Sequence, residues 1–142
     1  MQQLIEQRKD GTVSDTELLQ VMADFLDMGH VENIVAMYKQ EPRYYEWTGK
    51  LLTDERFAVR LGVAVLFEYL VAERPGEVAL AVPSLVRQLE NSESWVRGEA
   101  LNVLGIIGGE KVMAVVNKMT GDPDDQVVEI ARDILLQAGR GY

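Results

Sequence analysis

Few side chains of this chain could carry out acid–base or metal chemistry. His30 is its single histidine, and the 142 residues include no cysteine. A zinc ligand or a general base needs partner side chains at suitable spacing, and the sequence places none around His30. Because His30 follows Gly29 at the expected start of a helix, we expect it to be a solvated turn residue.

The acidic segment Asp122-Pro-Asp-Asp125 is the second candidate for chemistry. Calcium loops of the EF type need acids at alternating positions, a central glycine and a distal bidentate glutamate, and these features are missing. Acids at the start of a helix are stabilised by the helix dipole, which explains the cluster without a metal. We therefore predict no metal site.

The short motifs that bind nucleotides or build hydrolase sites are absent, including the Walker loop, GxGxxG, GxSxG and HExxH. Gly105, Gly108 and Gly109 come at the end of an expected helix, where they favour a turn and not a phosphate cradle. We therefore expect no catalytic residue and no cofactor, and we predict that the chain is not an enzyme.

The charge of the chain restricts its partners. Its net charge is -9, and the acidic excess is spread along the sequence. An acidic field repels phosphate backbones, so we expect no nucleic-acid partner. No apolar run is long enough to span a bilayer, and residues 1–10 contain no apolar leader segment. We expect a cytoplasmic protein without membrane contact.

A short pattern recurs three times along the chain. Each copy is a polar turn, then a valine, then an apolar helix: Asp54-Glu-Arg-Phe-Ala-Val-Arg60, Asn91-Ser-Glu-Ser-Trp-Val-Arg97 and Asp122-Pro-Asp-Asp-Gln-Val-Val128. The spacing between the valines is typical of helical repeat arrays, in which each unit buries its apolar face against its neighbours. We therefore expect Val59, Val96 and Val127 to point toward adjacent layers and away from water.

Helical spacing of apolar residues extends over nearly the whole sequence. We expect Ser14 and Glu17 to form a capping box, Gly29 and Gly139 to end helices, and Pro42 to break one. No stretch alternates like a half-buried strand. The prediction is an all-α chain of eight or nine helices in antiparallel pairs, over residues 3–9, 14–28, 31–39, 44–52, 56–73, 77–89, 94–107, 110–119 and 124–138.

Residues 82–108 resemble a HEAT repeat of the short bacterial and archaeal kind. They contain the first-helix leucines, the polar turn, the Val-Arg pair and the Leu-Gly-Xaa-Ile-Gly ending. The resemblance also holds for residues 53–71 and 112–138, and it is weak before Tyr44. It implies a right-handed α-solenoid over a single domain, 1–142, with divergent N-terminal helices in 1–43 and recognisable repeats in 44–138.

The resemblance implies structural roles for the turn residues. Asp54, Asn91 and Asp122 sit five residues before the aligned valines, where their side chains could accept the first amide hydrogens of each second helix. Arg60 and Arg97 could pair with turn carboxylates of a neighbouring repeat. The last copy has Val128 in the arginine position, which fits a terminal unit.

One lane of side chains on the second helices could bind a partner. If the valine side of each helix faces inward, Trp95 and its equivalents share another face, where aromatic residues often anchor a partner. The alternative is that the N-terminal helices cover this lane, which the small residues Ala58 and Gly62 would allow. The predicted partner-binding residues are Tyr69, Trp95, Glu99, Asn102, Ile106, Gln126 and Asp133.

A second aromatic cluster comprises Tyr44, Tyr45 and Trp47. A stacking platform for a sugar or a base is conceivable there, but amphipathic packing between helices is the simpler expectation.

The leading interpretation is a non-catalytic interaction or scaffold module that binds a protein or peptide and exists as a monomer or weak homodimer. The alternative is a HEAT-like enzyme or accessory subunit, because some proteins of this kind are DNA glycosylases and others resemble bilin lyases. The acidic balance argues against the glycosylase.

Overall fold

The computed structural model describes residues 14–140 of the chain, so the helix expected over residues 3–9 lies outside the described residues. Within that range the protein is all-helical and contains no strand. Its α-helices and 3-10 helices are α2 (Asp15–Asp27), α3 (Val31–Gln40), η1 (Pro42–Trp47), α4 (Thr48–Leu51), α5 (Phe57–Glu73), η2 (Val78–Ala81), α6 (Val82–Gln88), α7 (Ser94–Ile107), α8 (Glu110–Lys118), η3 (Met119–Gly121) and α9 (Asp125–Arg140).

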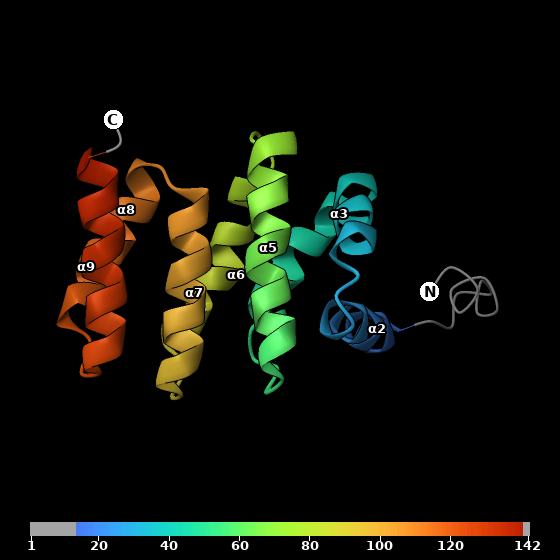
Figure 1. Cartoon of the computed structure of the whole chain (residues 1–142), viewed down its shortest axis with the longest axis horizontal. Coiled ribbons are helices and arrows are strands. Elements are labelled where there is room, and N and C mark those ends of the chain that lie inside the picture. The colour runs from blue at the N-terminus through green and yellow to red at the C-terminus, as the bar shows by residue number, and fades with distance from the viewer. Residues whose placement is uncertain (1–13, 141–142) are drawn as a thin grey trace.

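The helices form a layered stack. Helices α5, α7 and α9 stand side by side, while α6 and α8 lie behind them (Figure 1). Helix α4 packs on α5, α6 on α7 and α8 on α9, so each of α5, α7 and α9, called the outer helices, belongs to one pair. Helices α2 and α3 pack on α5 and cover the end of the stack opposite α9. The expected α-solenoid of paired helices is confirmed.

The three aligned valines anchor the stack. Val59, Val96 and Val127 are at most 1% exposed, as their equivalent positions predicted. The stripe that follows Val59 on α5 is also fully buried, including Leu66 and Phe67. Burying each such side chain stabilises the fold by about 1.5–3 kcal/mol relative to leaving it in water. The valines therefore fix which side of each outer helix meets the core and which meets solvent.

Local signals set most helix ends as expected. The Ser14 hydroxyl accepts a hydrogen bond from the Glu17 amide at 3.1 Å, which begins α2. Gly29 follows α2 with a φ of 84°, and Gly108 and Gly109 follow α7 with φ values of 72° and 100°. Side chains with a Cβ rarely adopt this left-handed conformation, so these glycines end their helices.

Three helix predictions need correction. The segment from Pro42 to Trp47 and the segment from Val78 to Ala81 are 3-10 helices, where longer α-helices were expected. Pro83 lies in the first turn of α6, where its missing amide costs no helical hydrogen bond, so α6 begins only at Val82. Helix α9 continues through Gly139, because a glycine without positive φ only weakens a helix by about 1 kcal/mol.

The first helices of two neighbouring pairs approach closely at Gly49. Its amide donates to the Ser84 hydroxyl at 3.1 Å, and that hydroxyl donates to the Ala81 carbonyl at 3.1 Å. A Cβ on Gly49 would lie 2.3 Å from the Ser84 carbonyl oxygen. Only glycine fits this contact, which fixes α4 against α6.

Candidate interaction surface

The turns that precede the outer helices are joined to neighbouring layers by arginines. Arg97 of α7 donates from Nε and Nη2 to the two carboxylate oxygens of Asp122, both at 2.9 Å. Its Nη1 donates to the carbonyls of Asn91 and Ser92 in its own turn. The Asp122 side chain is only 5% exposed and that of Arg97 12% exposed. This buried two-point pair confirms the expected contact between an arginine and the turn carboxylate of the next repeat.

Arg60 makes a different contact, although it holds the equivalent position on α5. Its Nη1 donates to the carbonyls of Asp54 and Glu55, as Arg97 does in its own turn. Its Nε, however, donates to the carboxylate of Glu99 on α7 at 3.0 Å. The next turn offers the neutral amide of Asn91 where Asp122 stands one repeat later, so the guanidinium pairs with a helix carboxylate.

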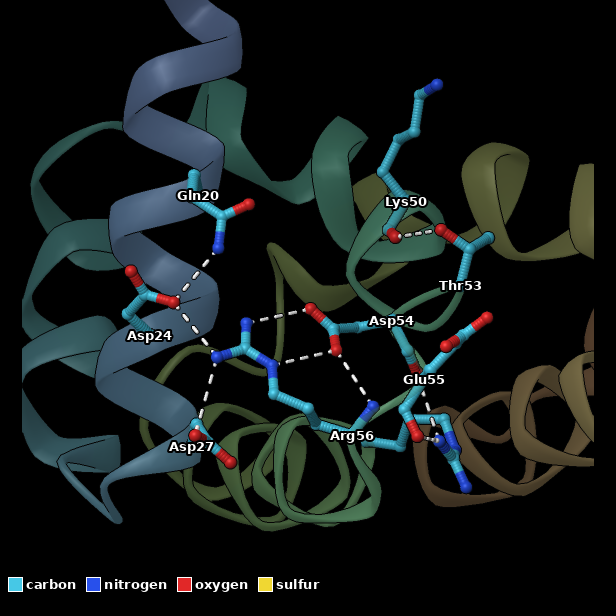
Figure 2. A network of polar contacts seen from close by, with 9 residues as sticks. Gln20, Asp24, Asp27, Lys50, Thr53, Asp54, Glu55 and Arg56 are labelled. Carbon is cyan, nitrogen blue, oxygen red and sulfur yellow. Dashed lines mark hydrogen bonds and ion pairs between the residues drawn. The ribbon is translucent and has the colours of Figure 1, made fainter.

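A third arginine, Arg56, connects the first turn to the N-terminal helices (Figure 2). It donates from Nε and Nη2 to the two carboxylate oxygens of Asp54, both at 3.0 Å. Its Nη1 reaches Asp24 of α2 at 3.0 Å and Asp27 at 3.4 Å. The spacing of these residues in the sequence did not indicate this network, because the three acids become neighbours of Arg56 only after α2 packs on α5.

The turn acids do not cap the helices in the way that was expected. Asp54 and Asp122 each accept the amide two residues on, from Arg56 and Asp124 at 2.9 Å. Both acids lie three residues before the first helical residue, too early to reach the amides inside the helix. Asp124 does that instead for α9, by accepting from the amides of Gln126 and Val127.

These contacts shift the ionisation of two turn carboxylates. Hydrogen bonds from Arg56 lower the pKa of Asp54, and hydrogen bonds from Arg97 lower the pKa of Asp122. The same pairings raise the pKa of Arg56 and of Arg97. The acidic segment at 122–125 therefore serves a salt bridge and a helix start. Among residues 14–140, no group of three or more His, Asp or Glu side chains is placed to hold a metal ion.

The predicted partner-binding residues lie on the solvent side of α5, α7 and α9, but they do not form one site. Trp95, Glu99 and Gln126 line a shallow groove of about 250 Å³. Asn102 and Ile106 line a second hollow, of about 300 Å³, at the other end of α7. Tyr69 is 44% exposed near the end of α5, and Asp133 is exposed on α9.

The Trp95 groove also contains residues that were not among the predicted partner-binding residues. Phe57, Arg60 and Asp124 line it together with Trp95. The Arg60 guanidinium lies over the Trp95 ring, 4.5 Å from its centroid, and over the Phe57 ring at 5.6 Å. Trp95 is therefore half-buried, with one face covered by an arginine of the neighbouring layer.

The N-terminal helices cover only part of the lane. Gly62 is buried, and a Cβ there would come 3.1 Å from Leu26 of α2. On either side of it along α5, Ala58 and Tyr69 are exposed. The lane is thus buried at Gly62, half-buried at Trp95 and exposed at Ala58 and Tyr69.

The outer side of α5 offers an exposed apolar stripe. Phe57 is 63% exposed and Leu61 52% exposed, and the half-buried Val65 and the exposed Tyr69 continue the stripe at four-residue spacing. These residues lie outside the buried stripe that begins at Val59. An amphipathic helix normally carries polar residues there, so this departure in the sequence is the signal that could have identified them.

The other candidates play structural roles. His30 is exposed, and its ring lies 5.7 Å from that of Phe25. Tyr45 is fully buried and packs edge-on against Tyr38, with ring centroids 4.9 Å apart. Tyr44 is buried against Trp47. The aromatic cluster is therefore packing between helices, as expected, and offers no open stacking platform.

Residues 45–135 match the family of HEAT repeats. The chain belongs to the HEAT-repeat family. The family match confirms the resemblance seen in residues 82–108. The repeats of this HEAT-repeat chain correspond to the three helix pairs α4 with α5, α6 with α7 and α8 with α9. HEAT repeats generally mediate protein interaction or scaffolding.

Searches of curated proteins and of solved structures found no significant match to this HEAT-repeat chain. Within residues 14–140, none of its helices combines the length and the apolar character needed to cross a bilayer.

Proposed function

We propose that this HEAT-repeat chain is a non-catalytic protein-binding module, and that its contact surface is the solvent side of α5, α7 and α9. The observation that supports the proposal is the exposed apolar stripe of α5, which lies beside the groove of Trp95. Contiguous exposed apolar residues mark interaction sites on proteins in water. Aromatic side chains such as Phe57 and Trp95 are enriched among the residues that dominate binding energy.

Two leucines of similar exposure provide a matched test. Leu61 is 52% exposed on the outer side of α5, and Leu80 is 48% exposed on η2, which packs beside the first helices. Replacing either with serine removes a similar apolar surface from water contact and should change the free energy of unfolding by no more than about 0.5 kcal/mol. The two variants therefore differ in the surface that they alter and not in stability.

The experiment is affinity capture from an extract of the native host with the wild-type chain, Leu61→Ser and Leu80→Ser, followed by mass spectrometry. We expect a set of proteins that the wild type and Leu80→Ser retain and that Leu61→Ser loses. If Leu61→Ser retains every specific partner, the outer face of α5 is not the contact surface. Trp95→Ala is a weaker test, because Trp95 packs against Arg60 and its loss also lowers stability.

A further inference from the structure

The three outer helices carry different chemistry at equivalent positions. Aligning Val59, Val96 and Val127 superposes the apolar stripe of α5 on Ser94, Gly98, Asn102 and Ile106 of α7 and on Asp125, Glu129, Asp133 and Gln137 of α9. The equivalent row is thus apolar on α5, mainly small or polar and partly buried on α7, and mainly acidic and exposed on α9.

The middle helix, α7, packs closely on α9 through two glycines. Gly98 and Gly105 of α7 lie so close to α9 that added Cβ atoms would come 3.1 Å from Ile130 and 2.9 Å from Ile134. The two hollows, of about 250 and 300 Å³, lie at the two ends of α7 and include these glycines. The first hollow reaches Phe57 and Arg60 of α5, whereas the second lies between α7 and α9. The surface of α7 between the apolar stripe of α5 and the row of α9, which includes both hollows, is called the trough.

The charge of the trough is one-sided. Arg60 on the α5 side is already paired with Glu99 and with two carbonyls. Asp125, Glu129 and Asp133 on the α9 side are all exposed, with Arg132 as the base among them. The helix dipole accounts for Asp125 in the first turn of α9, but Glu129 and Asp133 lie beyond its reach.

We propose that this trough binds a basic amphipathic peptide segment along α7. The inference rests on the proposed function and names the chemistry of the partner. Apolar side chains of the segment would contact Phe57 and Leu61 on α5, and its lysines or arginines would meet Glu129 and Asp133 on α9. An apolar face beside a basic face is the complement of an apolar stripe beside an acidic one.

Three synthetic peptides of about four helical turns test the chemistry directly. All three carry leucine at the same positions of one helical face, and their remaining positions are lysine, glutamine or glutamate. Binding is measured by fluorescence anisotropy of labelled peptide. Trp95 fluorescence in a Trp47→Phe background serves as a local reporter, because Trp47 is the chain's other tryptophan.

Two double variants with equal loss of charge locate the binding. Glu129→Gln with Asp133→Asn removes two acids beside the trough, and Glu32→Gln with Glu46→Gln removes two exposed acids on α3 and η1. We expect the lysine peptide to bind most tightly and the glutamate peptide least. The first double variant should weaken the lysine peptide roughly tenfold, and the second by less than about twofold.

The result that would overturn the inference is equal binding of the lysine and glutamine peptides, equal weakening by the two double variants, or no binding of the lysine peptide. None of these outcomes affects the proposed function, which fails only if Leu61→Ser keeps all native partners. If a native partner is lost from Leu61→Ser but retained by Glu129→Gln with Asp133→Asn, the proposed protein-binding surface stands and its preference for basic segments is overturned.

Discussion

The pair between Arg97 and Asp122 makes a quantitative prediction about how the last two layers are held together. Both side chains are largely removed from water, at 12% and 5% exposure. Breaking a buried ion pair from one side leaves an uncompensated charge, which typically costs about 3–5 kcal/mol. Arg97→Met should fall in this range, because it strips Asp122 of its partner and also uncovers the Asn91 and Ser92 carbonyls.

Asp122→Asn should cost less, about 2–3 kcal/mol. The asparagine oxygen can still accept from Arg97 and from the Asp124 amide, which now bonds to Oδ1 of Asp122. Its NH2 group, however, replaces the carboxylate oxygen that accepted from Nε–H of Arg97, so two donors face each other and this hydrogen bond is lost. In the double variant, Arg97→Met with Asp122→Asn, no charge is left buried. The combined loss should therefore be at least about 1 kcal/mol smaller than the sum of the single losses.

Urea unfolding followed by far-ultraviolet circular dichroism measures these free energies. The control is Glu73→Gln, which breaks the more exposed pair between Lys39 and Glu73 and should cost no more than about 1 kcal/mol. The reasoning is refuted if Asp122→Asn is no more destabilising than Glu73→Gln, or if the single losses add in the double variant.

The same pair predicts a pH dependence. Arg97 holds the pKa of Asp122 below its ordinary value of 3.8. The stability that this shift contributes is therefore fully present above about pH 4 and is lost as the pH falls through the lowered pKa. The free-energy difference between the wild type and Asp122→Asn should shrink over that acidic window. A difference that stays constant down to the lowest pH would contradict the assignment.

Two further substitutions test the packing around α4. Gly49→Ala should lower the free energy of unfolding in urea by about 2 kcal/mol or more, because its Cβ would press on the Ser84 carbonyl. The control Gly121→Ala, with open space around it, should change that free energy by under about 0.5 kcal/mol, and equal effects would contradict the close contact. Thr48→Val should cost about 1–3 kcal/mol, because it leaves the buried Tyr38 hydroxyl without its 2.9 Å partner, and a neutral thermal melt would show that another acceptor replaces it.

The sequence was sufficient for the stack of helices because one physical signal, the spacing of buried apolar residues, repeats in each pair. Val59, Val96 and Val127 alone placed the inward side of all three outer helices correctly. The contact between Arg97 and Asp122 was also predictable, since charge and spacing agree there.

The rest of the surface depends on contacts between helices that are distant in sequence. The expected carboxylate partner of Arg60 is absent because Asn91 is neutral, and the choice of Glu99 follows from how α5 meets α7. Similarly, Phe57 and Leu61 could be read as core until the side of α5 that faces water was known. A sequence reports that a residue is apolar, but the packing of the neighbouring helix decides whether it is covered.

Ion pairs connect neighbouring layers at both ends of the stack, and the two ends differ greatly in how exposed these pairs are. Arg56 meets Asp24 and Asp27 at side chains that are 37–48% exposed, whereas Arg97 and Asp122 are shielded from solvent. Mobile ions screen the first kind of contact strongly and the second weakly. Added salt will therefore weaken the packing of α2 on α5, while the contact between α7 and α9 is kept. Ionic strength thereby becomes a control on the flexibility of one end of the molecule alone, visible as faster amide hydrogen exchange in α2.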